Sequence, residues 1–338
     1  MHMADALLSP AVGLTMAAVS TGTVAYSVKK LSKGGLDEKK IPVMGIMGAF
    51  VFAGQMINFT IPGTGSSGHI GGGVLLAALL GPEAALLTLA AVLVIQCLFF
   101  ADGGLLALGC NIFNMGVCAA MVAYPLIFRP IVKKGLTKRR ITLASVLSVV
   151  LGLQLGAFCV VLETMLSGVS ALPFSSFVLL MQPIHLAIGL VEGLVTAAVL
   201  CYVHSVRPEL LECNLRQEKL GADVSLKKVL VTLLAVTVLV GGGLSLFASA
   251  NPDGLEWSIA GVTGSEELEA EGGIYDASSA VVDATAFLPD YAFSGDEENP
   301  AGTTVSSLVG SAIVLAVAVG AGALISRARK HKRAEAVR

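Results

Sequence analysis

The first two residues of the chain, Met1 and His2, carry three nitrogen atoms that can close around one metal ion. The terminal amine, the amide nitrogen of residue 2 and the His2 imidazole form a five-membered and a six-membered chelate ring. One equatorial position of a square plane stays open. Ni(II) and Cu(II) prefer that geometry and Co(II) can adopt it, whereas Zn(II) favours a tetrahedron. The alternative is a functionless histidine near a disordered terminus.

The residues that follow predict an ordered terminus. Residues 7–28 form an apolar stretch long enough to cross the hydrocarbon core of a bilayer, which is about 30 Å thick. A cleaved signal peptide carries positive charge before its apolar region, but here Asp5 comes before the stretch and Lys29 and Lys30 come after it. We therefore expect a retained membrane span. Because a bulky residue at position 2 hinders removal of Met1, the amine should stay where the chelate needs it.

The composition is that of a membrane protein. Hydrophobic residues make up 55% of the chain, charged residues only 14%, and there are 38 glycines. We predict an all-α, polytopic helical protein embedded in the lipid bilayer, with about seven spans in an N-terminal unit and two in a C-terminal unit. The candidate spans, of which the third is short, lie at 7–28, 41–60, 69–80, 83–101, 105–128, 141–163, 177–203, 229–249 and 304–326.

The basic residues predict the orientation. Segments 29–40, 129–140 and 204–228 hold five, six and five Lys or Arg residues, and the tail from Arg327 holds six, which accounts for all 22. All four segments lie on one side of the membrane if 69–80 is a crossing or half-crossing, and the positive-inside rule makes that side the cytoplasm. We therefore expect a plasma (inner) membrane protein with its N-terminus outside and its C-terminus in the cytoplasm.

The same alternation of spans brings His69 to the outer side. This residue follows a run rich in Gly, Ser and Thr, Pro62-Gly63-Thr64-Gly65-Ser66-Ser67-Gly68. Such a backbone cannot face lipid, so it should be buried in protein or line a polar cavity. His69 is thus the natural fourth nitrogen for the His2 chelate. The alternative is an ordinary solvated loop histidine.

Several short motifs, in the same order, resemble the CbiM/NikM family. They are Met1-His2-Met3, Ser67-Gly68-His69 with the glycines that follow it, Cys110-Asn111-Ile112-Phe113-Asn114, and Pro183-Ile184-His185 with Glu192-Gly193. The resemblance covers roughly residues 1–205. Members of this family are the substrate-capturing membrane components of energy-coupling-factor transporters for cobalt and nickel. The resemblance implies that Ni(II) or Co(II) is held by the Met1 amine, the amide nitrogen and imidazole of His2, and the imidazole of His69.

A second resemblance covers residues 225–338. Asn251-Pro252-Asp253-Gly254-Leu255-Glu256 is similar to the signature of the small CbiN/NikN component, also called the PDGLE domain. We predict a metal-capturing domain at 1–205, a cytoplasmic linker at 206–228 and a PDGLE domain at 229–338. The outer loop 250–303 holds twelve of the 24 acidic residues and no Lys or Arg. We expect its apolar residues to dock on the first domain. Its negative field can concentrate divalent cations; the alternative is that the acidic residues of an outer loop serve solubility.

Other polar residues within the predicted spans could support the metal ligands or the packing of helices. Asn111 or Asn114 could brace a metal ligand, because metal-bound imidazoles usually donate their second nitrogen to a fixed acceptor. His185 and Glu192 share a helix face, and hydrogen bonding to a neighbouring helix is their commoner role. The pairs Gly152 with Gly156 and Gly189 with Gly193 predict close helix crossings.

The family resemblance also implies partners. These are a transmembrane coupling subunit (CbiQ/NikQ-like) and ATPase subunits (CbiO/NikO-like), and no nucleic acid is expected. The chain has no G-x-x-x-x-G-K-[ST] loop, so we expect it to bind no nucleotide itself. A metal-free structural or assembly subunit of a transporter is the alternative function. An enzyme is disfavoured because no nucleophile and base occur at a recognisable spacing.

Overall fold

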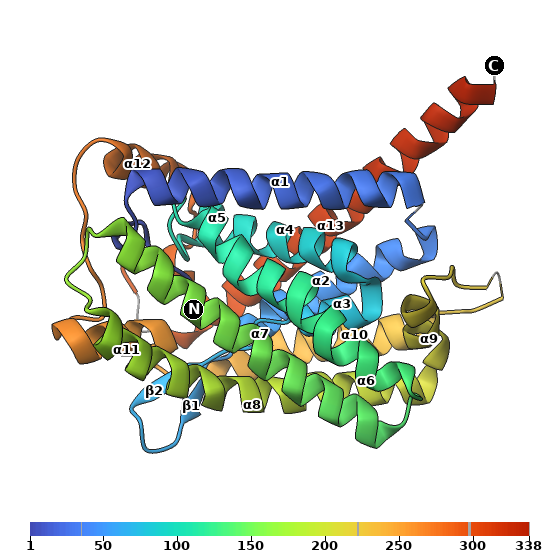
Figure 1. The fold of residues 1–338 in the computed structure, drawn as a ribbon, viewed down its shortest axis with the longest axis horizontal. Helices are drawn as coiled ribbons and strands as arrows, with labels where there is room; N and C mark the ends of the chain where they lie inside the picture. Colours follow the sequence, from blue (N-terminus) through green and yellow to red (C-terminus); the bar gives the residue numbers. More distant parts are fainter. Residues whose placement is uncertain (35, 222, 297–298, 338) are drawn as a thin grey trace.

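The computed structural model describes residues 1–34, 36–221, 223–296 and 299–337. It is an elongated bundle of helices that run roughly parallel to one long axis (Figure 1). The N-terminal unit contains the helices α1 (Pro10–Gly34), α2 (Ile41–Gln55), α3 (Gly73–Leu80), α4 (Pro82–Phe100), α5 (Leu108–Asn111), α6 (Arg129–Lys133), α7 (Lys138–Ser167) and α8 (Phe174–Val206). A π-helix, η3 (Ile112–Phe128), joins α5 to α6, and short 3₁₀ turns lie at η1 (Asp5–Leu7) and η2 (Glu38–Lys40).

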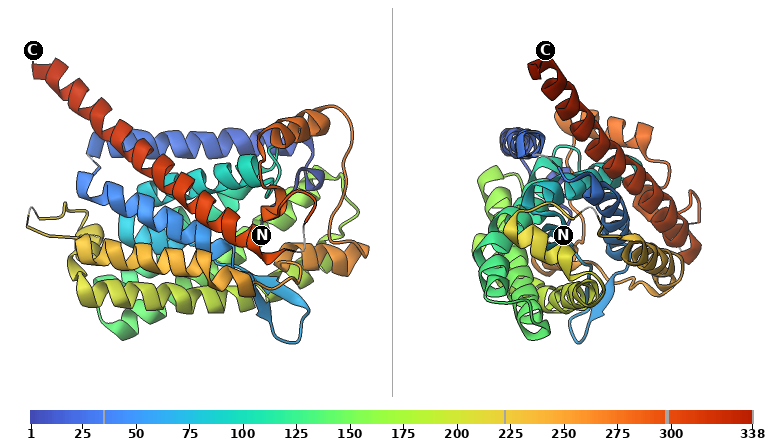
Figure 2. Two further views of the ribbon diagram at one scale, coloured as in Figure 1. Left: turned by 180° about the vertical axis from the view of Figure 1, so that it is seen from behind. Right: turned by 90° about the vertical axis from the view of Figure 1, so that its right-hand side faces the viewer.

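The C-terminal part supplies two long helices and a set of short ones. The long helices are α10 (Lys227–Gly242) and α13 (Pro300–Val337), and α13 crosses the bundle obliquely (Figure 2). Between them lie η4 (Leu244–Phe247), α11 (Gly254–Thr263), α12 (Ile274–Thr285) and η5 (Pro289–Tyr291). The predicted linker 206–228 is partly helical, because it contains α9 (Pro208–Arg216), which packs against α3 and α8.

Within the described ranges, seven helical segments are long and apolar enough to cross a membrane. They correspond to seven of the nine predicted spans. The other two are shorter than predicted. The span expected at 41–60 is the 15-residue helix α2, about 22 Å long at 1.5 Å per residue, and the span expected at 69–80 is the 8-residue helix α3. The protein is nevertheless a polytopic all-α membrane protein.

A small β-hairpin lies between α2 and α3. The strands β1 (Phe59–Ile61) and β2 (Ser66–Gly68) pair antiparallel, with Thr60 opposite Ser67. Gly63 and Gly65, at the turn between them, have φ values of +79° and +76°, which glycine adopts without steric cost. The chain therefore leaves the helical region after Gln55 and re-enters it at Gly73, and His69 lies in the connection between β2 and α3.

Close helix crossings depend on the predicted glycine pairs. A Cβ atom added at Gly193 would lie 2.7 Å from the Cα of Val146, and one added at Gly156 would lie 2.6 Å from the Asn114 carbonyl oxygen. These positions bring α8 against α7 and α7 against η3, so the predicted close crossings are confirmed.

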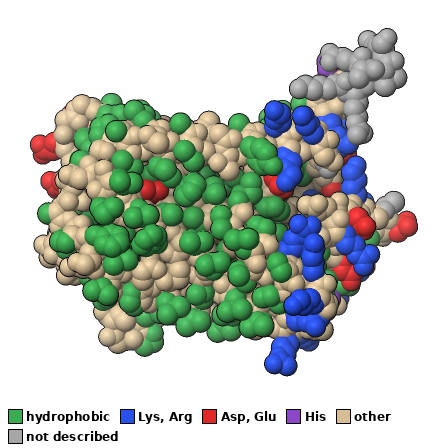
Figure 3. All heavy atoms as spheres, in the orientation of Figure 1, with side chains coloured by type: hydrophobic (Ala, Val, Ile, Leu, Met, Phe, Trp, Pro, Cys, Tyr) green, Lys and Arg blue, Asp and Glu red, His purple; other side chains and the backbone are tan. Residues whose placement is uncertain are grey.

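The two ends of the bundle differ in charge. Lys and Arg gather at the end that carries α6 and α9, which we call the basic end (Figure 3). The opposite end, which we call the distal end, carries the hairpin, α11 and α12 (Figure 1). Loop 250–303 docks there as expected: α11 packs on α8, α12 packs on α4, and the Trp257 indole donates to the Thr64 oxygen at 3.0 Å.

Candidate metal centre

The amino terminus is buried in the distal end and fixed by its backbone. The Met3 amide donates to Asn111 Oδ1 at 2.7 Å, and the Met3 oxygen accepts from Asn111 Nδ2 at 3.2 Å and from the Gly104 amide at 3.0 Å. Met1 and Met3 are both buried. The terminus is thus ordered, as the apolar stretch behind it predicts.

The two asparagines act differently from the predicted ring acceptors. Asn111 holds the backbone of Met3, and Asn114 donates to Glu163 Oε2 at 2.7 Å and approaches the Met3 sulfur at 3.7 Å. The hydrogen bonds of the described residues include none from either asparagine to an imidazole. Asn111 therefore braces the segment next to His2 through the main chain.

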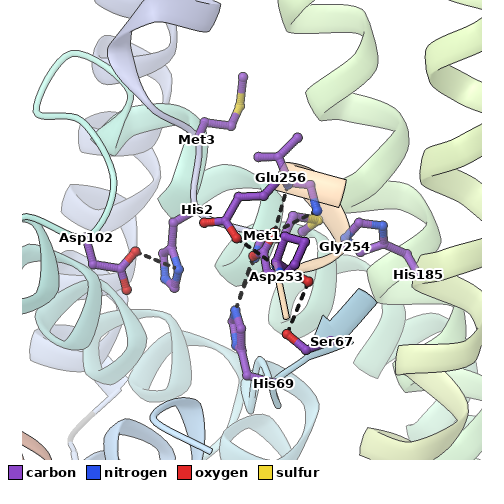
Figure 4. Close-up of polar contacts among 12 residues, drawn as sticks. Met1, His2, Met3, Ser67, His69, Asp102, His185, Asp253, Gly254 and Glu256 are labelled. Atoms are coloured by element: carbon purple, nitrogen blue, oxygen red, sulfur yellow. Dashed lines mark hydrogen bonds and ion pairs between the residues drawn. The ribbon is translucent and has the colours of Figure 1, made fainter. Parts of the chain in front are cut away.

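The three predicted ligand residues lie together (Figure 4). The Met1 ammonium donates to His69 Nε2 at 3.1 Å. The rings of His2 and His69 are stacked, with centroids 5.3 Å apart and planes 11° from parallel. Their side chains are only 8% and 9% exposed. Residues separated by 68 positions in sequence thus lie together in one buried cluster.

A carboxylate deep in the bundle holds the loop that carries His69. Glu192 on α8 accepts from the Gly71 amide at 2.9 Å and from the Gly72 amide at 2.8 Å, directly before the first turn of α3. The first amides of a helix have no acceptor within the helix, so an anion is favoured at this position. His69 Nδ1 lies 3.1 Å from the Ile70 oxygen. Because a carbonyl oxygen only accepts, Nδ1 carries the hydrogen and Nε2 presents its lone pair to the Met1 nitrogen.

Two carboxylates that the sequence did not single out as site residues contact the same nitrogens. Asp253, from the PDGLE segment, forms an ion pair with the Met1 ammonium and lies 3.8 Å from His69 Nε2. Asp102, just after α4, lies 3.1 Å from His2 Nδ1 and accepts from the Tyr291 hydroxyl. Two sequence features could have pointed to these carboxylates. Asp253 belongs to the PDGLE motif, and Asp102 is a lone acidic residue at the end of a predicted span.

Burial controls the ionisation of this cluster. Desolvation, aided by the terminal ammonium, lowers the pKa of both His2 and His69 to about 3, so both imidazoles are neutral at physiological pH. Burial opposes ionisation of Asp253, but the ammonium and His69 outweigh it and hold the pKa of Asp253 well below its usual range. Burial raises the pKa of Asp102, and the Tyr291 hydroxyl counteracts part of that rise.

The geometry fits part of the predicted chelate directly. Two nitrogens bound to neighbouring corners of a square plane, each about 2.0–2.1 Å from the ion, lie about 3 Å apart. The Met1 nitrogen and His69 Nε2 have this separation. The six-membered ring closes through His2 Nδ1, which here faces Asp102 while Nε2 has no hydrogen-bond partner. Chelation therefore requires the His2 ring to turn.

Side chains alone do not assemble a metal site in the described part of the chain. No group of three or more His, Cys, Asp or Glu residues there is arranged to hold an ion. A metal bound at His2 and His69 would need main-chain nitrogens in addition, as the amino-terminal chelate provides.

His185 lies beside the centre. Its Nδ1 is 2.8 Å from the Met181 oxygen, and its Nε2 has no partner and faces Gly254, where an added Cβ would lie 3.3 Å from it. A cavity of about 30 Å³ separates His185 and Glu192 from Met1 and His69. None of the described hydrogen bonds or ion pairs joins His185 to Met1, His2 or His69.

Comparisons with known proteins agree with this architecture. Residues 2–210 match the family described as the cobalt uptake substrate-specific transmembrane region, and residues 227–327 match the PDGLE domain. A putative fused nickel transport protein of Archaeoglobus fulgidus is 32% identical over 94% of this chain and 96% of its own length. A fused nickel transport protein of Rhodobacter capsulatus is 30% identical over 97% of this chain and 100% of its own.

Among the relatives, nickel and cobalt both occur in the names. A cobalt transport protein of Geobacter sulfurreducens is 28% identical over 81% of this chain and 79% of its own length. A crystal structure of a truncated transition metal transporter matches with a TM-score of 0.54 at 32% identity, and the match covers 61% of this chain and 99% of that one.

Proposed function

The chain belongs to the cobalt uptake substrate-specific transmembrane family and carries a fused PDGLE domain, and from this premise we propose that it captures Ni(II) or Co(II) at its amino terminus. It is a component of a cobalt or nickel transporter and not an enzyme. The proposed ligands are the Met1 amine, the amide nitrogen and imidazole of His2, and the imidazole of His69. The ion they hold is the transported substrate.

One observation carries the proposal. The Met1 nitrogen and His69 Nε2 lie 3.1 Å apart, the spacing of neighbouring ligands, and His2 stacks on His69 within the same buried pocket. Four nitrogens in one plane suit Ni(II), and a deprotonated amide strengthens that preference because it is a strong donor. Low-spin Ni(II) in such a plane is diamagnetic, which gives the proposal a spectroscopic signature.

The remaining parts of the mechanism follow from the family. We propose that the metal-loaded chain works with a transmembrane coupling subunit and ATPase subunits that drive uptake with ATP. The metal-capturing domain would comprise residues 1–205, the cytoplasmic linker 206–228 and the PDGLE domain 229–338. The gathering of Lys and Arg at the basic end supports an orientation with that end in the cytoplasm and the metal centre outside.

Metal analysis of the full chain tests the proposal. The protein should be purified through a tag after Arg338 from cells supplied with both metals. We expect one Ni or Co ion per chain. A single residue added before Met1 converts the amine into a peptide nitrogen and breaks the fused rings, so that variant should contain no stoichiometric metal.

Two results would contradict the proposal. If the extended protein binds metal as well as the native chain, the amino-terminal chelate is wrong, and His69 works with other partners. If the native chain contains no metal at all, the metal-free structural or assembly subunit becomes the better description.

A further inference from the structure

A large cavity opens beside the metal centre at the distal end. It has a volume of about 540 Å³ and is lined by both units of the chain. Among the described residues, nine carboxylates line it, including Asp5 and Asp102 from the first unit, Glu256 from α11, and the four glutamates between residues 266 and 271. Its described lining contains no Lys or Arg, so the cavity has a strongly negative potential.

His2, a proposed metal ligand, lines the inner wall of this cavity. Its side chain is 92% buried, and its Nε2 has no hydrogen-bond partner. Figure 4 shows the His2 ring between Asp102 and His69. The cavity therefore leads from the acidic outer loop to the buried nitrogens.

The smaller cavity on the other side of the centre is unsuited to a hydrated ion. Its volume of about 30 Å³ has room for about one or two water molecules. Much of its lining is apolar, including Met115, Leu153 and Ile188. A divalent ion still carrying its water shell needs the wider, acidic route.

We propose that the 540 Å³ cavity is an access chamber, in which a hydrated divalent cation is concentrated before it reaches His2. This inference rests on the proposed function. The chamber attracts a cation without binding it tightly, because no group of three or more His, Cys, Asp or Glu side chains among the described residues is arranged to hold an ion. A cleft lined by charges of one sign focuses the field and can raise association rates by about 10- to 1,000-fold.

Glu266, Glu267, Glu269 and Glu271 are the residues to test, because all four are exposed on the rim and none of them contacts the ligands. The full chain is tagged after Arg338, and its association with NiCl₂ is followed by stopped flow. In the Glu→Gln variant of all four, we expect association to slow about 3- to 10-fold at low salt. Dissociation should be unchanged, so the Kd rises by the same factor.

Matched control variants separate the chamber from net charge. Glu266→Gln/Glu267→Gln should slow association, whereas Glu212→Gln/Glu218→Gln, which removes two exposed charges in and just after α9 at the basic end, should not. Because charges in solvent are screened over about 3 Å at 1 M salt, the native and variant rates should converge there. A difference that persists at high salt would mean that the variant distorts the site, and it would overturn the chamber.

The remaining outcomes are also decisive. The variant with all four Glu→Gln changes could bind Ni²⁺ as fast as the native chain at low salt, or the basic-end variant could be slowed equally. Either result would refute the access chamber and leave the metal centre in place. If the native chain itself binds no Ni²⁺, the proposed function fails, and this inference falls with it.

Discussion

At the scale of single residues, the proposed ligands are held by groups that a metal must displace. Asp253 is paired with the Met1 ammonium, and Asp102 faces His2 Nδ1. Both contacts use a nitrogen that the proposed chelate needs. The backbone of the buried terminus is thereby ordered before metal arrives, and chelation then requires the His2 ring to turn. Such preorganisation favours tight binding because less conformational entropy is lost on binding.

The first prediction concerns the two imidazoles. His2→Ala and His69→Ala should each weaken Ni²⁺ binding by more than about 100-fold, because changes to groups that only support a ligand already cost about 10- to 100-fold. Isothermal titration of the purified full chain measures this. His185→Ala is the matched control, since His185 is also a histidine in the interior but none of its described hydrogen bonds or ion pairs reaches a ligand residue, and the affinity of this variant should stay near the native value. Complete loss in His185→Ala would show that the centre is misassigned.

The second prediction concerns protons. Metal ligands must be deprotonated. With the pKa of His2 and His69 lowered to about 3, both imidazoles have already lost their proton at pH 6, so neither should release one when Ni²⁺ binds. Titrations in buffers of different ionisation enthalpy should therefore show no additional proton release per Ni²⁺ at pH 6 compared with pH 7. Ordinary imidazoles with a pKa near 6.5 would release clearly more at pH 6 than at pH 7.

Sequence alone predicted Met1, His2 and His69 as ligands, because adjacent residues define a chelate and a Gly-rich run at membrane depth is typical of a functional loop. It could not identify Asp253 or Asp102 as their partners. The pairing of Asp253 with Met1 joins residues 252 positions apart and depends on how loop 250–303 docks. Periodicity and composition carry no information about such a contact between two units.

At the scale of elements, the connection from β2 to α3 determines where His69 lies. Glu192 holds the amides of Gly71 and Gly72, and Gly72 adopts a φ of +77°. The sequence predicts a short third span here, and the structure has an 8-residue helix preceded by an irregular segment. The apolar run of residues 74–80 predicts the helix. Hydropathy cannot show that the preceding glycines form a loop held by a carboxylate from another helix.

The third prediction tests that loop. Gly72→Ala should weaken metal binding, because an alanine is strained at positive φ and its Cβ would lie 2.6 Å from a Val51 methyl group. Gly63→Ala is the matched control: its φ of +79° imposes the same backbone strain, but a Cβ there meets nothing within 4 Å. We expect the Kd for Ni²⁺ to rise at least 10-fold in Gly72→Ala and to change less than about 3-fold in Gly63→Ala. Equal effects would mean that the connection does not position His69.

At the scale of the whole molecule, the fused second unit is part of the helical core as well as of the site. The helices α10 and α13 pack on α2, whose residues are buried almost all round, and η5 packs on α4. A helix that is apolar on every face belongs in such surroundings. The two family resemblances predicted two units and the positions of Lys and Arg predicted the basic segments, but this packing arrangement follows only from the three-dimensional contacts.

The last prediction concerns orientation, on which capture from outside depends. The acidic chamber and the metal centre share the distal end, and the basic segments share the other. In a background in which the half-buried Cys159, Cys201 and Cys213 are replaced by Ser, the Ser265→Cys variant should react with a membrane-impermeant maleimide in intact cells, because Ser265 is exposed. A cysteine at exposed Lys219, close to the basic helix α9, should react only after the cells are lysed. Retained Ni²⁺ uptake shows that each variant is correctly inserted. The reverse labelling pattern would put the amino terminus in the cytoplasm, where the centre could release metal to the cell but could not collect it from outside.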